Sequence, residues 1–405
     1  MAICWSPLLP GLLSVDSSLA FVTAFALFTA LVFAKRGVDI PQSALALLLM
    51  ACCLLLFLAT GSRTLLARTV PVPLLIFAAS QAASIQKLPE AICNALTAYL
   101  TVGVVLSIVG FVYAFGGGEA LLSIANPDGR ENALYLTTMT NFWVGNVIRP
   151  SYIYDEPGAF SFLLCATVAL RELLGKRFWP SLFLMLGGLI TLSLTHLLIA
   201  LLFLTTRLGF VKTCVLTAAV LVGGYMASED IDMFDFFTAR FVVEDGKLTG
   251  DNRSNQMGNL IDIINPKIFL FGDVVCHDRP DRSCPEHGDI SSSPATPVYR
   301  GGLFLLSVQL VVHVSLIMAF VRRKRFRFAA LTFTVLLLQR PFFDGVGYGF
   351  ITFTAVFLMF RSAPHLRRCP TVPFSDVTNR DLSRQRHSHS ESQPVPRNQS
   401  TPRFQ

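Results

Sequence analysis

The sequence predicts an all-α, polytopic integral membrane protein, because it is too apolar for a soluble chain of its length. Hydrophobic residues make up 53% of the 405 residues and charged residues only 15%, and the mean hydropathy is +0.56. A soluble protein of this size needs more charge to cover its surface. The 34 phenylalanines also suit a surface that faces lipid better than a soluble core.

Apolar runs long enough to cross about 30 Å of hydrocarbon recur along the chain. Single crossings are expected at residues 18–34, 40–60, 70–86, 94–115, 158–174, 211–226, 298–321, 327–340 and 346–360. The segment 178–206 is too long for one ordinary span and short for two. Both of its flanks are basic, and short basic loops stay in the cytoplasm, so we expect it to cross twice or to dip in and return. This gives about 11 spans, with the N-terminus outside and the C-terminus inside.

The net charge of +7 follows this topology. Lys and Arg gather in the inner segments, whereas most acidic residues fall outside. The inner basic groups are Lys35-Arg36, Arg171 with Lys176-Arg177, Arg207 with Lys212, and Arg322-Arg323-Lys324-Arg325. The positive charge therefore indicates membrane orientation and does not indicate a nucleic-acid partner.

The polar sequence falls into two outer loops and one tail. Residues 1–361 form the predicted membrane domain, with periplasmic loops at about 116–157 and 227–297. Apolar periodicity predicts a short amphipathic helix at 257–272. The tail 362–405 is rich in Ser, Arg, Gln and Pro, and we expect it to be disordered in the cytoplasm.

Two of the nine cysteines, Cys276 and Cys284, lie in the second outer loop. A disulfide between them is expected in an oxidising periplasm. A zinc site that adds His277 and His287 is the alternative, but its spacing matches no standard pattern. We therefore expect no metal and no other cofactor.

The segment Arg149–Gly158 places an arginine and two carboxylates, Asp155 and Glu156, where the chain enters a membrane span. Charge at this boundary is costly unless it is paired or used, so the segment is a candidate site. Pro157 suits the first turn of a helix, and acids suit a helix N-terminus. Glu156 is therefore a helix cap or a carboxylate that accepts a proton, and the two roles are compatible.

Four arginines are expected on the outer side of the membrane: Arg68, Arg149, Arg253 and Arg340. A guanidinium group stays charged and offers a planar fork of donors. Several of them converging on one cavity would bind a phosphate or a pyrophosphate. The alternative is that each arginine snorkels to the interface or pairs with a nearby acid.

Midway through 178–206, the residues Thr191, Ser193 and His196 form a polar turn. Each arm of a double crossing would have about 14 residues and a length of about 21 Å, which is less than the bilayer thickness. The turn is then expected at the floor of a cavity, within protein or beside water. His196 is a base there or a histidine satisfied by neighbouring hydroxyl groups.

The run Arg149-Pro150-x-x-x-x-Asp155-Glu156-Pro157-Gly158-Ala159-Phe160 resembles the motif of bacterial O-antigen and exopolysaccharide repeat-unit polymerases (Wzy-type). Leu189–Ser193 resembles the Thr-x-Ser stretch of the same superfamily, which includes the O-antigen ligases. Arg253 and the run Gln339-Arg340-Pro341 fit the same pattern. The order of these elements and the topology resemble the family over most of the chain before the tail.

The resemblance implies a GT-C-type glycosyltransferase that works without a metal on the periplasmic face of the bacterial inner membrane. Its donor would be a growing glycan on undecaprenyl pyrophosphate, and its acceptor a hydroxyl group of the next lipid-linked repeat unit. Membrane lipid and a chain-length regulator are the other expected partners. The four outer arginines would hold the pyrophosphate, with Glu156 as the first candidate base and His196 as the second. The supporting residues would be Asp155, Thr191, Ser193 and Gln339.

Three alternative functions are also compatible with the sequence. An O-antigen ligase would share the donor but use a lipid A core acceptor, and the Asp155-Glu156-Pro157-Gly158 run favours the polymerase. A lipid-linked oligosaccharide flippase or another transporter would carry charges near mid-bilayer and repeated halves. Here the distinctive charges fall at the outer ends of spans. A non-catalytic subunit of a polysaccharide export complex is the third alternative.

Overall fold

The computed structural model describes ten stretches of the chain, to which the structural statements below refer. They are residues 40–85, 87–125, 131–144, 147–215, 217–218, 243–244, 247–248, 252–274, 294–341 and 343–361. Four sequence predictions lie outside the described residues: the span 18–34, most of the span 211–226, the Cys276–Cys284 disulfide and the disordered tail 362–405.

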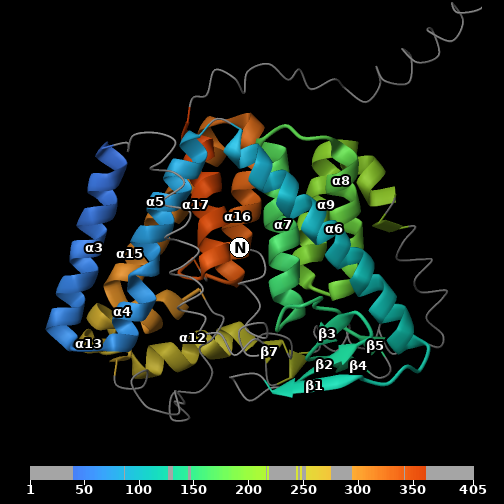
Figure 1. The fold of residues 1–405 in the computed structure, drawn as a ribbon, viewed down its shortest axis with the longest axis horizontal. Coiled ribbons are helices and arrows are strands. Elements are labelled where there is room, and N and C mark those ends of the chain that lie inside the picture. The colour runs from blue at the N-terminus through green and yellow to red at the C-terminus, as the bar shows by residue number, and fades with distance from the viewer. Residues whose placement is uncertain are drawn as a thin grey trace, which may run out of the picture. The chain divides into compact units, whose positions relative to one another are not determined.

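The described part is mostly helical (Figure 1). In chain order, the helices are α3 (Ile40–Thr60), α4 (Arg63–Thr69), α5 (Pro71–Ser84), α6 (Leu88–Phe115), α7 (Pro157–Leu173), α8 (Phe178–Gly187), the 3-10 turn η2 (Gly188–Thr191), α9 (Leu194–Leu208), α12 (Asn252–Ile263), α13 (Pro266–Phe271), α15 (Thr296–Arg322), the 3-10 turn η5 (Lys324–Phe326), α16 (Arg327–Gln339) and α17 (Val346–Phe360). Helices α3, α7, α16 and α17 each begin and end within one residue of a predicted span.

Several of these helices have membrane-spanning character. Within the described stretches, three helical segments are long and apolar enough to cross a membrane: Arg63–Ser84, which joins α4 and α5, Leu88–Phe115 (α6) and Thr296–Arg322 (α15). Shorter apolar helices lie at Ala44–Thr60, Phe178–Thr191, Leu194–Leu208 and Gly347–Phe360. The chain therefore carries the apolar helices of a membrane protein.

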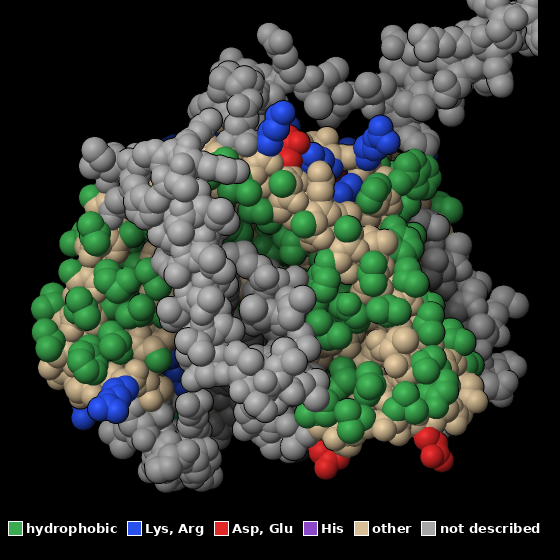
Figure 2. Space-filling view, viewed as in Figure 1, with side chains coloured by type: hydrophobic (Ala, Val, Ile, Leu, Met, Phe, Trp, Pro, Cys, Tyr) green, Lys and Arg blue, Asp and Glu red, His purple; other side chains and the backbone are tan. Residues whose placement is uncertain are grey.

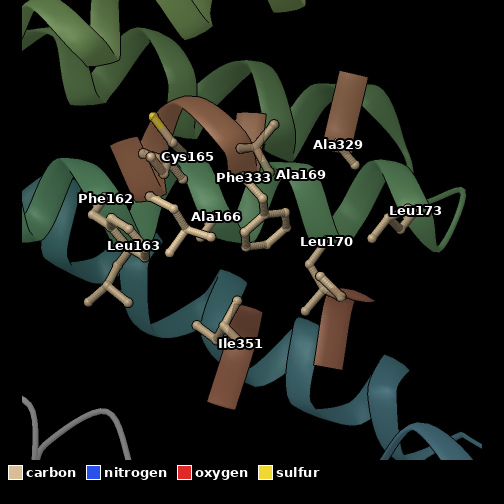
Figure 3. Close-up of a cluster of buried hydrophobic side chains, with 14 of the residues drawn as sticks. Phe162, Leu163, Cys165, Ala166, Ala169, Leu170, Leu173, Ala329, Phe333 and Ile351 are labelled. Carbon is tan, nitrogen blue, oxygen red and sulfur yellow. The ribbon is translucent and has the colours of Figure 1, made fainter. Parts of the chain in front are cut away.

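Helix α7 is enclosed by its neighbours, and 15 of its 17 residues are buried. It packs against α6, α8, α9, α16 and α17. Figure 3 shows side chains of α7, among them Phe162 and Leu170, packed with Phe333 of α16 and Ile351 of α17. A helix that is apolar on every side is stable where protein or lipid surrounds it completely. Helix α7 therefore forms the core of the described helices.

The segment 178–206 breaks in its middle. Helix α8 and the turn η2 lead to Leu192, whose backbone is left-handed with a φ of 50°. Ser193 then caps the N-terminus of α9, where its hydroxyl group accepts the backbone N–H of His196. Leu192 is thus the point at which the chain changes direction, one residue after the end of η2.

Both ends of this segment lie at the C-terminal end of α7. Nη2 of Arg171 donates to the carbonyl group of Arg177, just before α8, at 2.9 Å. Arg207, near the end of α9, forms an ion pair with Glu172. The segment therefore leaves one end of α7 and returns to it, in agreement with its two basic flanks.

Ion pairs between distant elements lie at the two ends of α7. Where α7 finishes, Lys176 pairs with Glu90 at 2.9 Å. Where α7 begins, Arg340 pairs with Glu156. On the face drawn in Figure 2, charged side chains lie along the upper and lower edges, and hydrophobic side chains cover much of the described band between them. The Lys176–Glu90 pair and the Arg340–Glu156 pair each join residues that the sequence predicts on the same side of the membrane.

The first outer loop corrects the all-α prediction, because it contains strands at one end of the helices (Figure 1). The strands β1 (Leu122–Ala125), β2 (Glu131–Tyr135) and β3 (Thr138–Thr140) form an antiparallel sheet, β4 (Trp143–Val144) pairs with β5 (Val147–Ile148), and in the second loop β6 (Val243–Glu244) pairs with β7 (Lys247–Leu248). Most of these strands are too short to give a clear alternation of apolar and polar residues, so periodicity does not reveal them.

The sheet of the first loop packs on the second half of α6. The hydroxyl group of Thr137 donates to the carbonyl group of Leu106 at 2.6 Å. A Cβ atom on Gly110 would lie 2.5 Å from the Thr138 side chain, so glycine permits this close approach. Helix α6 has 28 residues, and at about 1.5 Å per residue it is longer than the hydrocarbon core of a bilayer. Its extra length supports the outer loop.

The amphipathic helix expected at 257–272 is instead divided between α12 and α13. The break lies at Asn265, whose side chain accepts two backbone N–H groups of α13 at 3.0 Å each. Helix α13 packs against α15 where α15 is kinked at Gly301-Gly302. Gly302 has a φ of 58°, and a Cβ atom there would collide with the backbone of Leu270.

We expect Gly349→Ala to destabilise the protein, because Gly349 lies where α17 approaches α5. A Cβ atom there would collide with the carbonyl oxygen of Phe343 and lie 2.9 Å from the Leu75 side chain. Overpacking of this kind costs about 1–3 kcal/mol, which should lower the midpoint of thermal unfolding in detergent. Gly258→Ala in α12 is the matched control, since its Cβ position is open. Equal midpoints for the two variants would contradict the close helix contact.

Candidate functional site

The segment Arg149–Gly158 is fixed by backbone contacts with the outer sheet. The backbone N–H of Met139 donates to the carbonyl group of Tyr152 at 2.6 Å. The fully buried hydroxyl oxygen of Ser151 lies 2.8 Å from the carbonyl oxygen of Met139 and 2.7 Å from that of Tyr154. These contacts hold the polar segment in one conformation before it enters α7.

Aromatic rings support the same segment. The Tyr152 ring lies 5.6 Å from the Tyr99 ring and 5.9 Å from the Phe160 ring, measured between centroids. The Tyr154 hydroxyl group donates to that of Tyr99 at 3.1 Å. Burial raises the pKa of both the Tyr152 and the Tyr154 phenol, so both stay protonated near neutral pH. Tyr152 also has a φ of 57°, which packing must stabilise in a residue other than glycine.

Arg149 joins this segment to the break in 178–206. Its Nε donates to the carbonyl group of Thr191 at 3.0 Å, and its guanidinium lies 5.0 Å from the centroid of the Phe142 ring. Thr191 ends η2, where carbonyl groups lack helical partners. The structure thus brings together two predicted site residues that are 42 positions apart in the sequence.

Glu156 and Arg340 form an ion pair where α7 begins and α16 ends. The side chain of Arg340 is 15% exposed and that of Glu156 is 17% exposed. Asp155 and Tyr348 lie close enough to interact electrostatically with the same guanidinium. Gly158 permits this arrangement, since a Cβ atom there would lie 2.6 Å from Nη2 of Arg340. Two predicted site residues therefore meet in a mostly buried pair.

The geometry of Glu156 bears on the two roles predicted for it. Glu156 occupies the N-cap position of α7, but its side chain makes no capping hydrogen bond. Pro157, the first residue of the helix, has no backbone N–H, which lowers the need for a cap. The carboxylate pairs with Arg340 instead. The structure therefore favours a charge-pairing role over simple helix capping.

His196 is fully buried. Its Nε2 lies 2.8 Å from the carbonyl oxygen of Met185, and its Nδ1 lies 3.3 Å from both the Ser161 hydroxyl oxygen and the Cys165 sulfur. These contacts tie α9 to α7 and α8. Of the two roles predicted for His196, they favour a histidine satisfied by its neighbours, because a fully buried ring offers a substrate no access.

The other predicted site residues lie on separate elements. Arg68 is in α4, which packs mainly against α3 and α15. Arg253 is in the first turn of α12, and its side chain is outside the described part of the chain. Gln339 is the last residue of α16 and precedes Arg340. The convergence of all four arginines on one cavity stays a prediction.

A further ion pair at this end joins Asp344 to Arg300, which is not among the predicted site residues. The guanidinium nitrogen and the carboxylate oxygen lie 3.0 Å apart. Arg300 lies near the start of the predicted span 298–321, two glycines before Leu303. The signal that identifies Arg340, an arginine at the end of an apolar run, therefore also applies to Arg300. Tyr348 gives no comparable signal, because it lies within the apolar sequence of α17.

These features define a class: a helical protein with apolar helices long enough to cross a membrane, and with ion pairs and a buried polar turn near the start of α7. No protein-family model matches the chain, and neither a curated protein nor a solved structure matches it. In the described ranges, no group of three or more His, Cys, Asp or Glu residues is placed to hold a metal ion.

Reversing both charges of the Glu156–Arg340 pair should restore stability that either single reversal removes. Glu156→Arg or Arg340→Glu alone places like charges side by side in a mostly buried position. Breaking a fully buried pair costs about 3–5 kcal/mol, and less where some exposure remains. We expect each single variant to unfold at a lower temperature in detergent and the double variant to recover part of the loss. Additive losses in the double variant would show that the two side chains do not interact.

Proposed function

We propose that the protein is a polymerase that joins undecaprenyl-pyrophosphate-linked oligosaccharide repeat units into a surface polysaccharide or exopolysaccharide. The observation that carries the proposal is the Glu156–Arg340 pair at the start of α7, with Arg149 fixed at the other end of the same segment. This glycosyl transfer would use a carboxylate to take the proton of the acceptor hydroxyl group. It would use guanidinium groups to stabilise the charge on the leaving pyrophosphate. The resemblance of the segment to Wzy-type polymerases supports the same reaction.

In the proposed reaction, an acceptor hydroxyl group attacks the anomeric carbon of the donor glycan. The new C–O bond forms as the bond between that carbon and the pyrophosphate oxygen breaks, and the bonding electrons leave with the lipid pyrophosphate. Glu156 takes the hydroxyl proton. Arg149 and Arg340 stabilise the negative charge that develops on the leaving oxygens. Direct displacement of this kind inverts the anomeric centre.

Pyrophosphate binding would change the resting ion pair. A pyrophosphate carries more negative charge than a carboxylate and competes with Glu156 for Arg340. As the guanidinium turns to the pyrophosphate, the carboxylate loses a cation that opposes its protonation and becomes a better base. Donor binding would thereby activate the base once the leaving group is in place.

The rest of the proposal concerns the surroundings of this site. Arg253 on α12 and Arg68 on α4 would add positive charge near the pyrophosphate, and Asp155 would help to orient Arg340. The reaction would occur on the periplasmic face of the bacterial inner membrane, with the C-terminus in the cytoplasm. Membrane lipid and a chain-length regulator protein are the expected partners beside the lipid-linked substrates.

Deletion of the gene distinguishes the polymerase from the alternatives. A polymerase predicts that the polysaccharide ladder disappears from a glycan gel while a single repeat unit is still transferred. Polymer that stays on its lipid carrier and never reaches the lipid core would instead identify a ligase. Loss of all lipid-linked oligosaccharide from the periplasmic face would identify a flippase, and an unchanged ladder would contradict all three functions.

Arg149→Ala and Glu156→Gln should each lower polymer formation about 100-fold, the usual effect of removing a charge-stabilising donor or a general base. Arg63→Ala is the matched control, because Arg63 is an exposed arginine at the start of α4. Polymer is measured by gel densitometry in a deletion strain, together with the amount of each variant in the membrane fraction. A normal ladder from Arg149→Ala at normal membrane levels would contradict the pyrophosphate-binding role.

A further inference from the structure

We propose that an open groove between α6 and α8 binds the phosphate headgroup of an anionic membrane lipid, at a site independent of the proposed glycosyl transfer. The groove has a volume of about 470 Å³. Its lining includes Asn94, Thr97 and Thr101 of α6, Arg171 of α7, and Trp179 and Phe183 of α8. It lies toward the C-terminal end of α7, at the opposite end from the Glu156–Arg340 pair.

Arg171 is the charged group of this groove, and it is only 4% exposed. Its Nε donates to the Ser181 hydroxyl group at 2.8 Å and its Nη1 to the Thr97 hydroxyl group at 2.9 Å. Its Nη2 donates to the carbonyl group of Arg177 at 2.9 Å. All three acceptors are neutral, and a guanidinium has five N–H donors in total. Two donors and the full positive charge therefore have no match among these contacts.

Two acids at this end of α7 form ion pairs with other cations, and one of them, Glu172, also interacts electrostatically with Arg171. Glu172 pairs with Arg207, and Glu90 pairs with Lys176. No carboxylate of the described residues lies within ion-pair distance of Arg171. A buried charge without a counter-charge of its own is costly in an apolar environment. An anionic headgroup would supply that counter-charge and accept the remaining N–H groups of Arg171.

The surface beside the groove favours a lipid over a soluble anion. Trp179 is 66% exposed and Phe183 is 40% exposed. Farther along α6, Val102 and Val105 are 53% and 46% exposed, which continues the apolar surface away from the charged end. Acyl chains would lie along this surface, whereas a soluble phosphate would gain nothing from it. Tryptophan at a membrane interface and basic pockets between helices are typical of sites that bind lipid headgroups.

Native mass spectrometry of the purified full-length protein tests the preference directly. The protein is equilibrated with equal amounts of phosphatidylglycerol and phosphatidylcholine that carry the same acyl chains. We expect the wild type to retain phosphatidylglycerol about fivefold more than phosphatidylcholine, the preference that one basic side chain gives for an anionic lipid. Equal retention of the two lipids would overturn the proposal.

Two variants of α6 locate the lipid. Ala98→Phe should abolish the preference, because Ala98 lines the groove and a phenyl ring would fill it without replacing a partner of Arg171. Val109→Phe is the matched control: it adds the same side chain at an exposed position three turns farther along α6 and should keep the preference. An unchanged preference in Ala98→Phe would overturn the proposal.

Two further measurements test whether the charge of Arg171 is needed and whether the bound phosphate belongs to a lipid or to a soluble anion. Arg171→Gln should lose the preference for phosphatidylglycerol, and Arg171→Lys, which keeps the charge, should retain part of it. Phosphatidylglycerol should raise the unfolding temperature of the wild type, whereas inorganic phosphate should not. Equal stabilisation by inorganic phosphate alone would identify a soluble-anion site and overturn the assignment to a lipid.

Discussion

The enclosure of α7 is the constraint on which the rest of the structure depends. In lipid, helices associate through van der Waals packing and close approach, because hydrocarbon chains are as apolar as the side chains that they would replace. Small residues such as Ala159, Ala166 and Ala169, all buried, let α7 meet its neighbours closely. A helix surrounded in this way has room for charge only near its ends, and there it places Glu156 and Arg171.

The charged groups at the two ends of α7 have different kinds of partner. Its 17 residues span about 25 Å, which is less than the hydrocarbon thickness of about 30 Å. Charge at either end therefore lies in a poorly solvated setting and needs a partner. Glu156 has a cation, Arg340, whereas Arg171 has three neutral acceptors. This difference supports the proposed exchange of one anion for another at the first end and the proposed lipid counter-charge at the second.

The sequence predicts helices well and contacts poorly, for a physical reason. The length of an apolar run fixes a helix such as α17, and an arginine at the end of such a run, such as Arg340, is evident from the sequence. Nothing local shows that Arg340 meets Glu156, 184 positions earlier. The burial of His196 likewise depends on residues of other helices, such as Ser161 of α7. The strands of the first loop are stabilised by contacts with other elements, such as that of Thr137 with α6, and most of them are too short to leave a periodic signal.

The Glu156–Arg340 pair also connects the local sequence to the proposed chemistry. Pro157 leaves the first turn of α7 with one unpaired N–H fewer, and Gly158 leaves space for the guanidinium, and the carboxylate pairs with Arg340 instead of capping α7. A carboxylate held by a cation is a poor base, because the cation stabilises its charged form. The contact that stabilises the resting site therefore opposes proton transfer. In the proposed reaction, a pyrophosphate that draws Arg340 away would remove that opposition, so the paired geometry would be the resting state and the reactive geometry would require the donor.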